Sequence, residues 1–224
     1  RGGDELARHL LERGFTEDEV TTAGLCGRSQ RGLYDRFRGR LVWPIRDITG
    51  DTVGFGARRI FDDDRIAAKY LNTSETPIYT KNQVLYGLDL AKREVARSHR
   101  IVVVEGYTDV MAMVDAGLST TVATCGTAFT AHHASLISAR IGDGGEVVTG
   151  FDNDDAGDKA AHGLRRAGWK REKPQGKDWN DDLRALRGQA QRSGRIVVVL
   201  LGLRRLRPRR GLAGRGPRRG LDRA

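Results

Sequence analysis

Three acidic clusters follow one another along the second half of the chain: VVVEGYTDV at 102–110, GFDNDDAG at 150–157 and GKDWNDD at 176–182. In the first two, an apolar run ends and carboxylates follow at once. This is the pattern at the carboxyl ends of parallel strands, where open α/β sheets bind ligands. Carboxylate oxygens at one sheet edge suit a hard cation such as Mg²⁺, which supports chemistry on phosphates. The pattern predicts that four side chains converge on a cation: Glu105, Asp109, Asp152 and Asp154.

The elements that must position these acids alternate in type from residue 100 onward. Short apolar segments of strand character are separated by segments whose apolar residues recur with helical spacing. Strands that alternate with helices of this length predict a parallel, doubly wound sheet of the α/β class. We expect strands at 101–104, 120–123 and 146–151, and helices at 108–116, 132–141 and 156–166.

The first half of the chain predicts a smaller α+β subdomain. One helix is expected at 4–13, and a second, short helix is expected between a cap near Thr16 and a stop at Gly24. A Thr-Gly-Asp turn within 41–61 predicts a hairpin. The remaining segments are expected to be a loop or short helix at 32–40, an extended loop at 62–82 and a helix at 85–98.

Composition divides the chain further. We expect a basic amino-terminal subdomain at 1–99, a sheet domain at 100–191 and an Arg- and Gly-rich tail at 192–224. The tail lacks a helical or strand period and enough apolar surface to order itself, so disorder is expected there. It is interpreted either as a nucleic-acid-binding segment or as a non-native reading frame at the terminus.

The charge is segregated along the chain. The net charge is +10, and residues 192–224 account for all of it, with eleven Arg and one acidic residue. Residues 28–100 carry 15 basic and 9 acidic side chains, whereas residues 101–191 carry 10 and 13. A basic part ahead of an acidic part suits a nucleic-acid track beside a metal site, because neutralisation of phosphates supplies most non-specific affinity.

Basic side chains in the first half are the candidates for phosphate contacts with a nucleotide or template: Arg36, Arg38, Arg40, Arg58, Arg59, Lys69 and Lys81. A strand-to-helix turn at Gly126 and Thr127 offers backbone amides that could hold a triphosphate. Tyr107, inside EGYTD, is expected to be a packing residue.

Cysteine usage and hydropathy point to the compartment. Cys26 and Cys125 lie far apart and neither has a CxxC partner, so no disulfide framework and no zinc site are expected. No apolar run reaches the roughly 18 residues of a bilayer span, and no signal peptide opens the chain. We therefore expect a cytoplasmic protein without a membrane contact.

Several long motifs in register resemble the RNA polymerase core of DnaG-type bacterial primases. They are YDRFRGRLVWPIRDITGDTVGFGARRI at 34–60, KYLNTSETPIYTKNQVLYGL at 69–88, VVVEGYTDVMA at 102–112, ATCGTAFTAHH at 123–133 and FDNDDAGDKAA at 151–161. The resemblance covers about residues 3–182. It implies a TOPRIM fold behind a smaller basic subdomain. It also implies a metal-dependent DNA-directed RNA polymerase that makes short RNA primers from ribonucleoside triphosphates on a single-stranded DNA template.

The resemblance also implies roles for individual residues. Glu105 matches the TOPRIM glutamate and Asp109 the second acid of EGYxD, Asp152 and Asp154 match the DxD pair, and Asp178 matches the first acid of a DPD-like motif. In such enzymes these groups hold two or more Mg²⁺ or Mn²⁺ ions. The basic residues that match family positions near the nucleotide and template are Arg58, Lys69 and Lys81.

The sequence departs from the family pattern in places. Asn153 replaces a glycine, Asn180 stands where a second aspartate is expected, and the link between Asp154 and Asp178 is short for a helix and a full strand. These departures leave open a catalytically inactive, nucleic-acid-binding TOPRIM remnant of a mobile-element protein, and a TOPRIM nuclease. The zinc-ribbon and helicase-binding domains of the family are missing from the sequence. We therefore expect a fragment whose full-length form has a replicative helicase as its partner.

Overall fold

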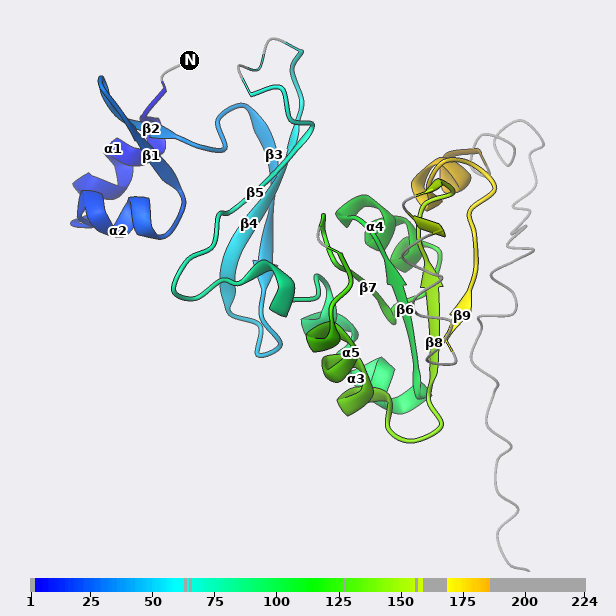
Figure 1. Ribbon diagram of the computed structural model, residues 1–224. Helices are drawn as coiled ribbons and strands as arrows, with labels where there is room; N and C mark the ends of the chain where they lie inside the picture. The colour runs from blue at the N-terminus through cyan, green and yellow to red at the C-terminus, as the bar shows by residue number, and fades with distance from the viewer. Residues whose placement is uncertain are drawn as a thin grey trace, which may run out of the picture.

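The structure is a computed structural model that describes residues 3–185 except 63, 65, 127, 156 and 159–168. Figure 1 shows a small helical and hairpin unit at the amino terminus, then a twisted antiparallel sheet, then a parallel sheet with helices against it. The tail expected at 192–224 lies outside the described residues, as does most of the helix expected at 156–166.

The amino-terminal unit consists of two helices and a two-stranded hairpin: α1 Glu5–Glu12, α2 Glu17–Thr22, β1 Cys26–Ser29 and β2 Gly32–Asp35. Both helices were predicted, and Thr16 begins α2 through a capping box with Glu19. The loop or short helix expected at 32–40 is wrong in its first part, because β2 pairs antiparallel with β1. A four-residue strand beside an Arg-rich segment is too short for alternation to reveal it.

The next unit is a three-stranded antiparallel sheet in the order β3-β4-β5. Its strands are β3 Arg40–Arg46, β4 Thr52–Arg59 and β5 Tyr70–Asn72. The hairpin of β3 and β4 confirms the prediction from the Thr-Gly-Asp turn. The extended loop expected at 62–82 is wrong at 70–72, because these residues pair with β4. The 3₁₀ helix η1 Lys81–Gln83 and the helix α3 Leu88–Ser98 follow.

The second half forms the predicted parallel sheet, with strand order β7-β6-β8-β9. The strands are β6 Arg100–Val104, β7 Thr121–Ala123, β8 Glu146–Gly150 and β9 Lys170–Arg171, and the helices between them are α4 Tyr107–Asp115 and α5 Ala131–Ile141. The two residues of β9 explain the short link before Asp178: the chain makes only a minimal edge strand beside β8.

The central strand β6 is buried on both faces because the four residues after Arg100 are all apolar. In β6, Ile101 and Val103 pack with residues of α3 and α5, while Val102 and Val104 pack with residues of α4. Successive side chains of a strand point to opposite faces, so the single run RIVVV supplies both cores. This rigid central strand carries Glu105 at its carboxyl end.

The antiparallel sheet and the parallel sheet share aromatic packing. The Tyr107 ring stacks on Trp43 with centroids 5.5 Å apart and meets the edge of Tyr86 at 4.7 Å. The Tyr107 hydroxyl donates to Oδ1 of Asn72 at 2.9 Å, and Nδ2 of Asn72 donates to the Cys125 carbonyl at 2.9 Å. Tyr107 is therefore the packing residue that the sequence predicted, and it joins the two halves.

Both cysteines are free thiols in buried positions, at Cys26 and Cys125. Among the helices of the described chain, none combines the length and the apolar character that a bilayer span requires.

Candidate functional site

The acidic residues gather where β6 and β8 lie side by side. β7 lies on one side of β6 and β8 lies on the other. The strand order therefore reverses direction at β6, and ligands of open α/β sheets bind at the carboxyl ends of the strands at such a point. Val104 is paired with Gly150, which places Glu105 and Asp152 just beyond neighbouring strand ends. The Asp152 amide donates to Oε1 of Glu105 at 3.0 Å. Two of the predicted acids are therefore in direct contact.

Asp109 enters the same edge from the first turn of α4. Its Oδ2 accepts the Gly106 amide at 3.2 Å, and its side chain is buried. Its Oδ1 is also buried and has no close hydrogen-bond donor among the described residues, although the Asn180 backbone amide acts on this carboxylate and lowers its pKa. The positive end of helix α4 favours an acid at this position. That effect does not supply a hydrogen bond to the second carboxylate oxygen.

Asp152 and Asp154 lie in the turn after β8. The Asp152 side chain has a buried Oδ1 that accepts no hydrogen bond within the described residues. Asp154 is exposed, and its Oδ1 accepts the Gly157 amide at 2.8 Å. Asp154 therefore caps the start of a helical turn, whereas Asp152 points an unpaired oxygen into the site.

Asp178 is brought to the site by its neighbour Trp179. The Trp179 ring is buried, and its Nε1 donates to the carbonyl of Gly150 at the end of β8, at 2.8 Å. The Asn153 amide donates to the carbonyl of Lys177 at 3.2 Å, so the two turns are linked on both sides of Asp178. Oδ1 of Asp178 accepts the amide of Asp181 at 2.8 Å.

The electrostatics show that these carboxylates act on one another. Burial raises the pKa of Asp109 to about 7, and the charges of Asp152 and Asp178 add to the increase. Burial also raises the pKa of Asp152 to about 6, with further contributions from Glu105, Asp178 and Asp154. Like charges held together in a poorly solvated place disfavour ionisation. This cluster therefore favours either protons or a cation.

No group of three or more His, Cys, Asp or Glu side chains within the described residues is already arranged to hold a metal ion. Oδ1 of Asp154 and Oδ1 of Asp178 each accept a backbone amide. The unpaired oxygens of Asp109 and Asp152 fit a divalent cation. Convergence of the acids on one ion stays a prediction.

Two of the predicted basic residues are occupied by contacts within the protein. The Arg40 side chain is fully buried, with Nε 2.8 Å from Oδ2 of Asp64. Its Nη2 donates to the carbonyls of Ile66 and Ala68 at 2.9 and 3.0 Å, so Arg40 clamps the loop between β4 and β5. Nη1 of Arg36 donates to the Gly24 carbonyl at 3.3 Å. Nη1 of Arg40 has no hydrogen-bond partner among the described residues but is buried, so in this conformation Arg40 exposes no donor to a phosphate.

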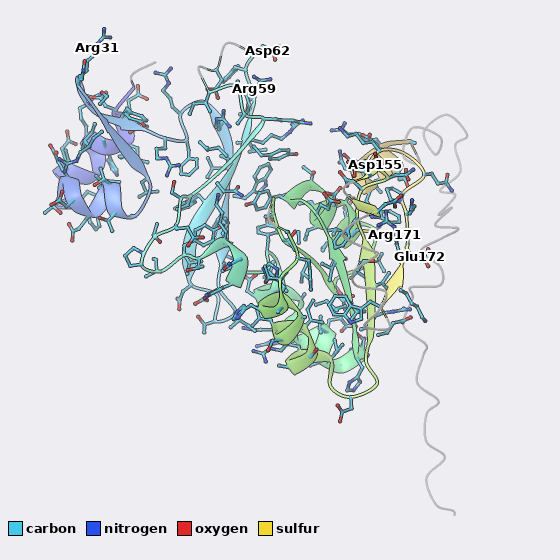
Figure 2. All side chains as sticks on the ribbon, viewed as in Figure 1. Arg31, Arg59, Asp62, Asp155, Arg171 and Glu172 are labelled. Carbon is cyan, nitrogen blue, oxygen red and sulfur yellow. The ribbon has the colours of Figure 1, made fainter. Side chains whose placement is uncertain are left out.

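The other basic candidates are more accessible. Lys69 is exposed beside β5, and its Nζ lies 5.7 Å from the centre of the Tyr70 ring. Arg58 is half-buried at the end of β4, and Lys81 is half-buried in η1. Figure 2 shows the neighbouring Arg59 at the same, upper end of the molecule as Asp155. The basic end of β4 thus lies on the same side as the acidic strand ends.

The predicted triphosphate turn is described only in part. Gly126 is exposed and has φ +83°, in the left-handed region that favours glycine. Thr127 lies outside the described residues.

Sequence reasoning missed Trp179 and Asn72. A single aromatic residue inside the polar GKDWNDD segment is a signal that could have identified Trp179 as an anchor. Asn72 gave no such signal in the sequence, because its role depends on a contact between two distant segments.

The fold and the acidic strand ends define a TOPRIM-like domain, and comparison with known proteins agrees. Residues 102–183 match a family model described as Toprim-like. Residues 1–92 match a model described as the N-terminal domain of the DNA primase catalytic core.

Individual relatives extend the match. A DNA primase of Mycolicibacterium smegmatis is 56% identical over 164 residues, which are 71% of this chain and 26% of the relative. The RNA polymerase domain of Mycobacterium tuberculosis primase DnaG is 45% identical, with a TM-score of 0.76 over 85% of this chain and 67% of that chain. A DnaG primase catalytic domain bound to single-stranded DNA is 34% identical, with a TM-score of 0.69 over 86% of this chain and 62% of that one.

The chain belongs to the DnaG family of DNA primases. It spans about a quarter of the length of the curated relatives that it matches.

Proposed function

We propose that this chain is the RNA polymerase core of a DNA primase and makes short RNA primers on single-stranded DNA from ribonucleoside triphosphates. The observation that carries the proposal is the group of acids at the strand ends of a TOPRIM-like sheet, with two buried carboxylate oxygens left unpaired. The proposal includes a division of labour between a basic part at 1–99 and a TOPRIM part at 100–191. A replicative helicase stays a predicted partner.

The reaction joins a 3′-hydroxyl to the α-phosphorus of an incoming nucleotide. The bond from that phosphorus to the bridging oxygen breaks, pyrophosphate leaves, and the hydroxyl proton is lost to solvent or a base. Two or more bound Mg²⁺ or Mn²⁺ ions would lower the pKa of the attacking hydroxyl and neutralise the leaving oxygens. We propose that five acids hold these ions: Glu105, Asp109, Asp152, Asp154 and Asp178.

The chain's own residues contribute position and charge. Glu105 holds the start of the Asp152 turn through the backbone amide, which fixes one ligand relative to another. Phosphate contacts are proposed for Arg58, Lys69 and Lys81, and a backbone contact with the triphosphate for Gly126 and Thr127. Arg36 and Arg40 are proposed to act by shaping the template surface, since their guanidinium groups bind backbone carbonyls. Binding of single-stranded DNA by a related DnaG catalytic domain supports the choice of template.

The test is primer synthesis by the full chain on single-stranded DNA with labelled ribonucleotides and Mg²⁺ or Mn²⁺. Asp152→Asn is expected to lower the rate by about a thousandfold, because several kcal/mol of charge stabilisation would be lost. Asp155→Asn is the matched control, since Asp155 is an exposed acid of the same turn. It should leave the rate within about twofold of the wild type.

Other outcomes would favour the alternative functions. Folded, Mn²⁺-binding protein that makes no dinucleotide would support the inactive remnant. Cleavage of DNA without nucleotides would support the nuclease.

A further inference from the structure

Arg171, in the edge strand β9, is a buried arginine that contacts both ends of the acidic turn after β8. Its side chain is 3% exposed. Nη1 donates to the Gly157 carbonyl, and Nη2 donates to the Asp152 carbonyl at 3.3 Å. Nη2 also lies 2.7 Å from Oδ1 of Asp158. One planar group therefore holds the first and last residues of the turn that contains Asp152 and Asp154.

The contacts of Arg171 leave the acids of the site free. The guanidinium binds the main chain of Asp152, and the buried Oδ1 of that residue accepts no hydrogen bond from a described residue. Among the described residues, the guanidinium forms its ion pair with Asp158, which is half exposed and also pairs with Lys173. An arginine bound to Asp152 or Asp154 through the carboxylate would compete with a cation, and this one does not.

The turn itself is tightly closed, so its ends must be held at a fixed separation. A Cβ at Gly157 would lie 2.2 Å from the Asp152 carbonyl oxygen, a distance that no side chain tolerates. The Asp158 amide donates to the Asp154 carbonyl at 2.9 Å. Arg171 is itself fixed by its pairing with Thr149 and by the bond from the Glu172 amide to the Thr149 carbonyl.

Figure 2 shows Arg171 below Asp155 in the upper part of the parallel-sheet domain. The two residues of β9 place the Arg171 guanidinium against this turn. Outer-shell groups of this kind fix the orientation of metal ligands.

We propose that Arg171 is a positioning residue that fixes the main chain of the 152–158 turn, so that Asp152 and Asp154 present carboxylates that Arg171 does not occupy to a divalent cation. The cation part rests on the proposed function. The main-chain part does not, because it concerns a turn that exists with or without an ion.

The first measurement is Mn²⁺ binding to the full chain without nucleotide. Arg171→Met should weaken binding by about 10- to 100-fold, the usual cost of losing an outer-shell partner. Arg171→Lys keeps the charge but loses the planar guanidinium group. Its affinity for Mn²⁺ should therefore lie between that of the wild type and that of Arg171→Met. In primer synthesis, Arg171→Met should raise the half-saturating Mn²⁺ concentration by a similar factor and recover most of its rate at saturating Mn²⁺.

Two control variants separate positioning from bulk charge. Arg97→Met removes an exposed arginine that pairs with Glu94 on α3, far along the chain from the site. Asp158→Asn removes the carboxylate partner of Arg171 and leaves both carbonyl contacts. Both variants should bind Mn²⁺ within about threefold of the wild type.

The second measurement is amide hydrogen exchange at Gly157 and Asp158, whose amides bond to Asp154. Arg171→Met should speed their exchange at least tenfold in metal-free protein, while amides of β6 stay protected. Wild-type protection in Arg171→Met would overturn the proposal, whatever the metal result. Wild-type Mn²⁺ affinity in folded Arg171→Met would overturn it as well. A wild-type protein that binds no Mn²⁺ would instead contradict the proposed function. Amide hydrogen exchange would still test whether Arg171 fixes the main chain of the turn.

Discussion

The antiparallel sheet β3-β4-β5 and the parallel sheet around β6 use their residues in opposite ways. The central strands of the parallel sheet, β6 and β8, bury apolar residues on both faces and carry their charged groups at or beyond the strand ends. The antiparallel sheet leaves large apolar side chains exposed, among them Leu41 at 49% and Val42 at 39%. It also buries a charged one, Arg40. In the parallel sheet, the position of a residue relative to a strand end therefore indicates its function. In the antiparallel sheet, residue type alone is a misleading guide to exposure and function.

The difference extends to what holds each sheet together. The parallel sheet has two cores that it builds with α3, α4 and α5. The antiparallel sheet packs Ile45 and Trp43 into the α4-side core of the parallel sheet and has no large core of its own among the described residues. Substitution of an acid at the strand ends of the parallel sheet should therefore relieve repulsion, whereas substitutions in the antiparallel sheet should destabilise the protein by removing contacts.

The largest expected effect is the pH dependence of stability at Asp109. Its pKa in the folded state is about 7, above the ordinary value of 3.8. A raised carboxyl pKa means that the folded state binds the proton more tightly than the unfolded chain does. The contribution of Asp109 to the free energy of unfolding is therefore greatest below pH 4 and falls as pH rises toward 7. At about 1.4 kcal/mol per pKa unit, the free energy of unfolding that is lost over this range is about 4 kcal/mol.

Urea unfolding of the metal-free protein at pH 5 and pH 8 tests this effect. Asp109→Asn should be more stable than wild type at both pH values, and its advantage should grow by about 2–3 kcal/mol between them. Asp143→Asn, in an exposed turn, serves as the control. An advantage of Asp109→Asn that is the same at both pH values would contradict the raised pKa.

A second effect, of about 3 kcal/mol, is expected for Arg40→Met. Removing one partner of a buried ion pair leaves Asp64 and two carbonyls unsatisfied. Lys69→Met, at an exposed residue of the loop between β4 and β5 that Arg40 contacts, should change stability by less than about 0.5 kcal/mol. It should instead weaken single-stranded DNA binding. It should also reduce, by about one, the slope of the logarithm of the binding constant against the logarithm of the salt concentration. Chemical unfolding and salt-dependent binding titrations separate the two residues, and equal loss of stability in both would refute the contrast.

The smallest expected effect concerns Gly56 in β4. A Cβ there would lie 2.3 Å from Cζ of Tyr107, so Gly56→Ala must displace the ring that joins the two sheets. Overpacking of this kind costs about 2 kcal/mol. Tyr107→Leu removes the clashing atoms, so the double variant should lose less stability than the sum of the single variants. Additive losses in thermal or urea unfolding would show that the ring and the glycine do not interact.

The sequence allowed prediction of the elements with strong local signals. The run IVVVE identified both a central strand and the position of Glu105, and the same reasoning identified β8 and Asp152. It failed at β5, since three residues cannot reveal a period and the strand exists only because β4 pairs with it. Arg40 was predicted as a phosphate contact from its charge, but burial depends on the loop that folds over it. Arg171 gave no signal for the same reason.

The pairing of Gly56 with Tyr107 has a consequence for exchange of parts between relatives. The glycine lies in the first half, and the tyrosine lies in the second half, two residues before Asp109. A chimera that joins the first half of one protein to the second half of another must inherit this pair intact, together with Asn72. Recombination near residue 99 should therefore cost the least stability between parents that match at these three distant positions.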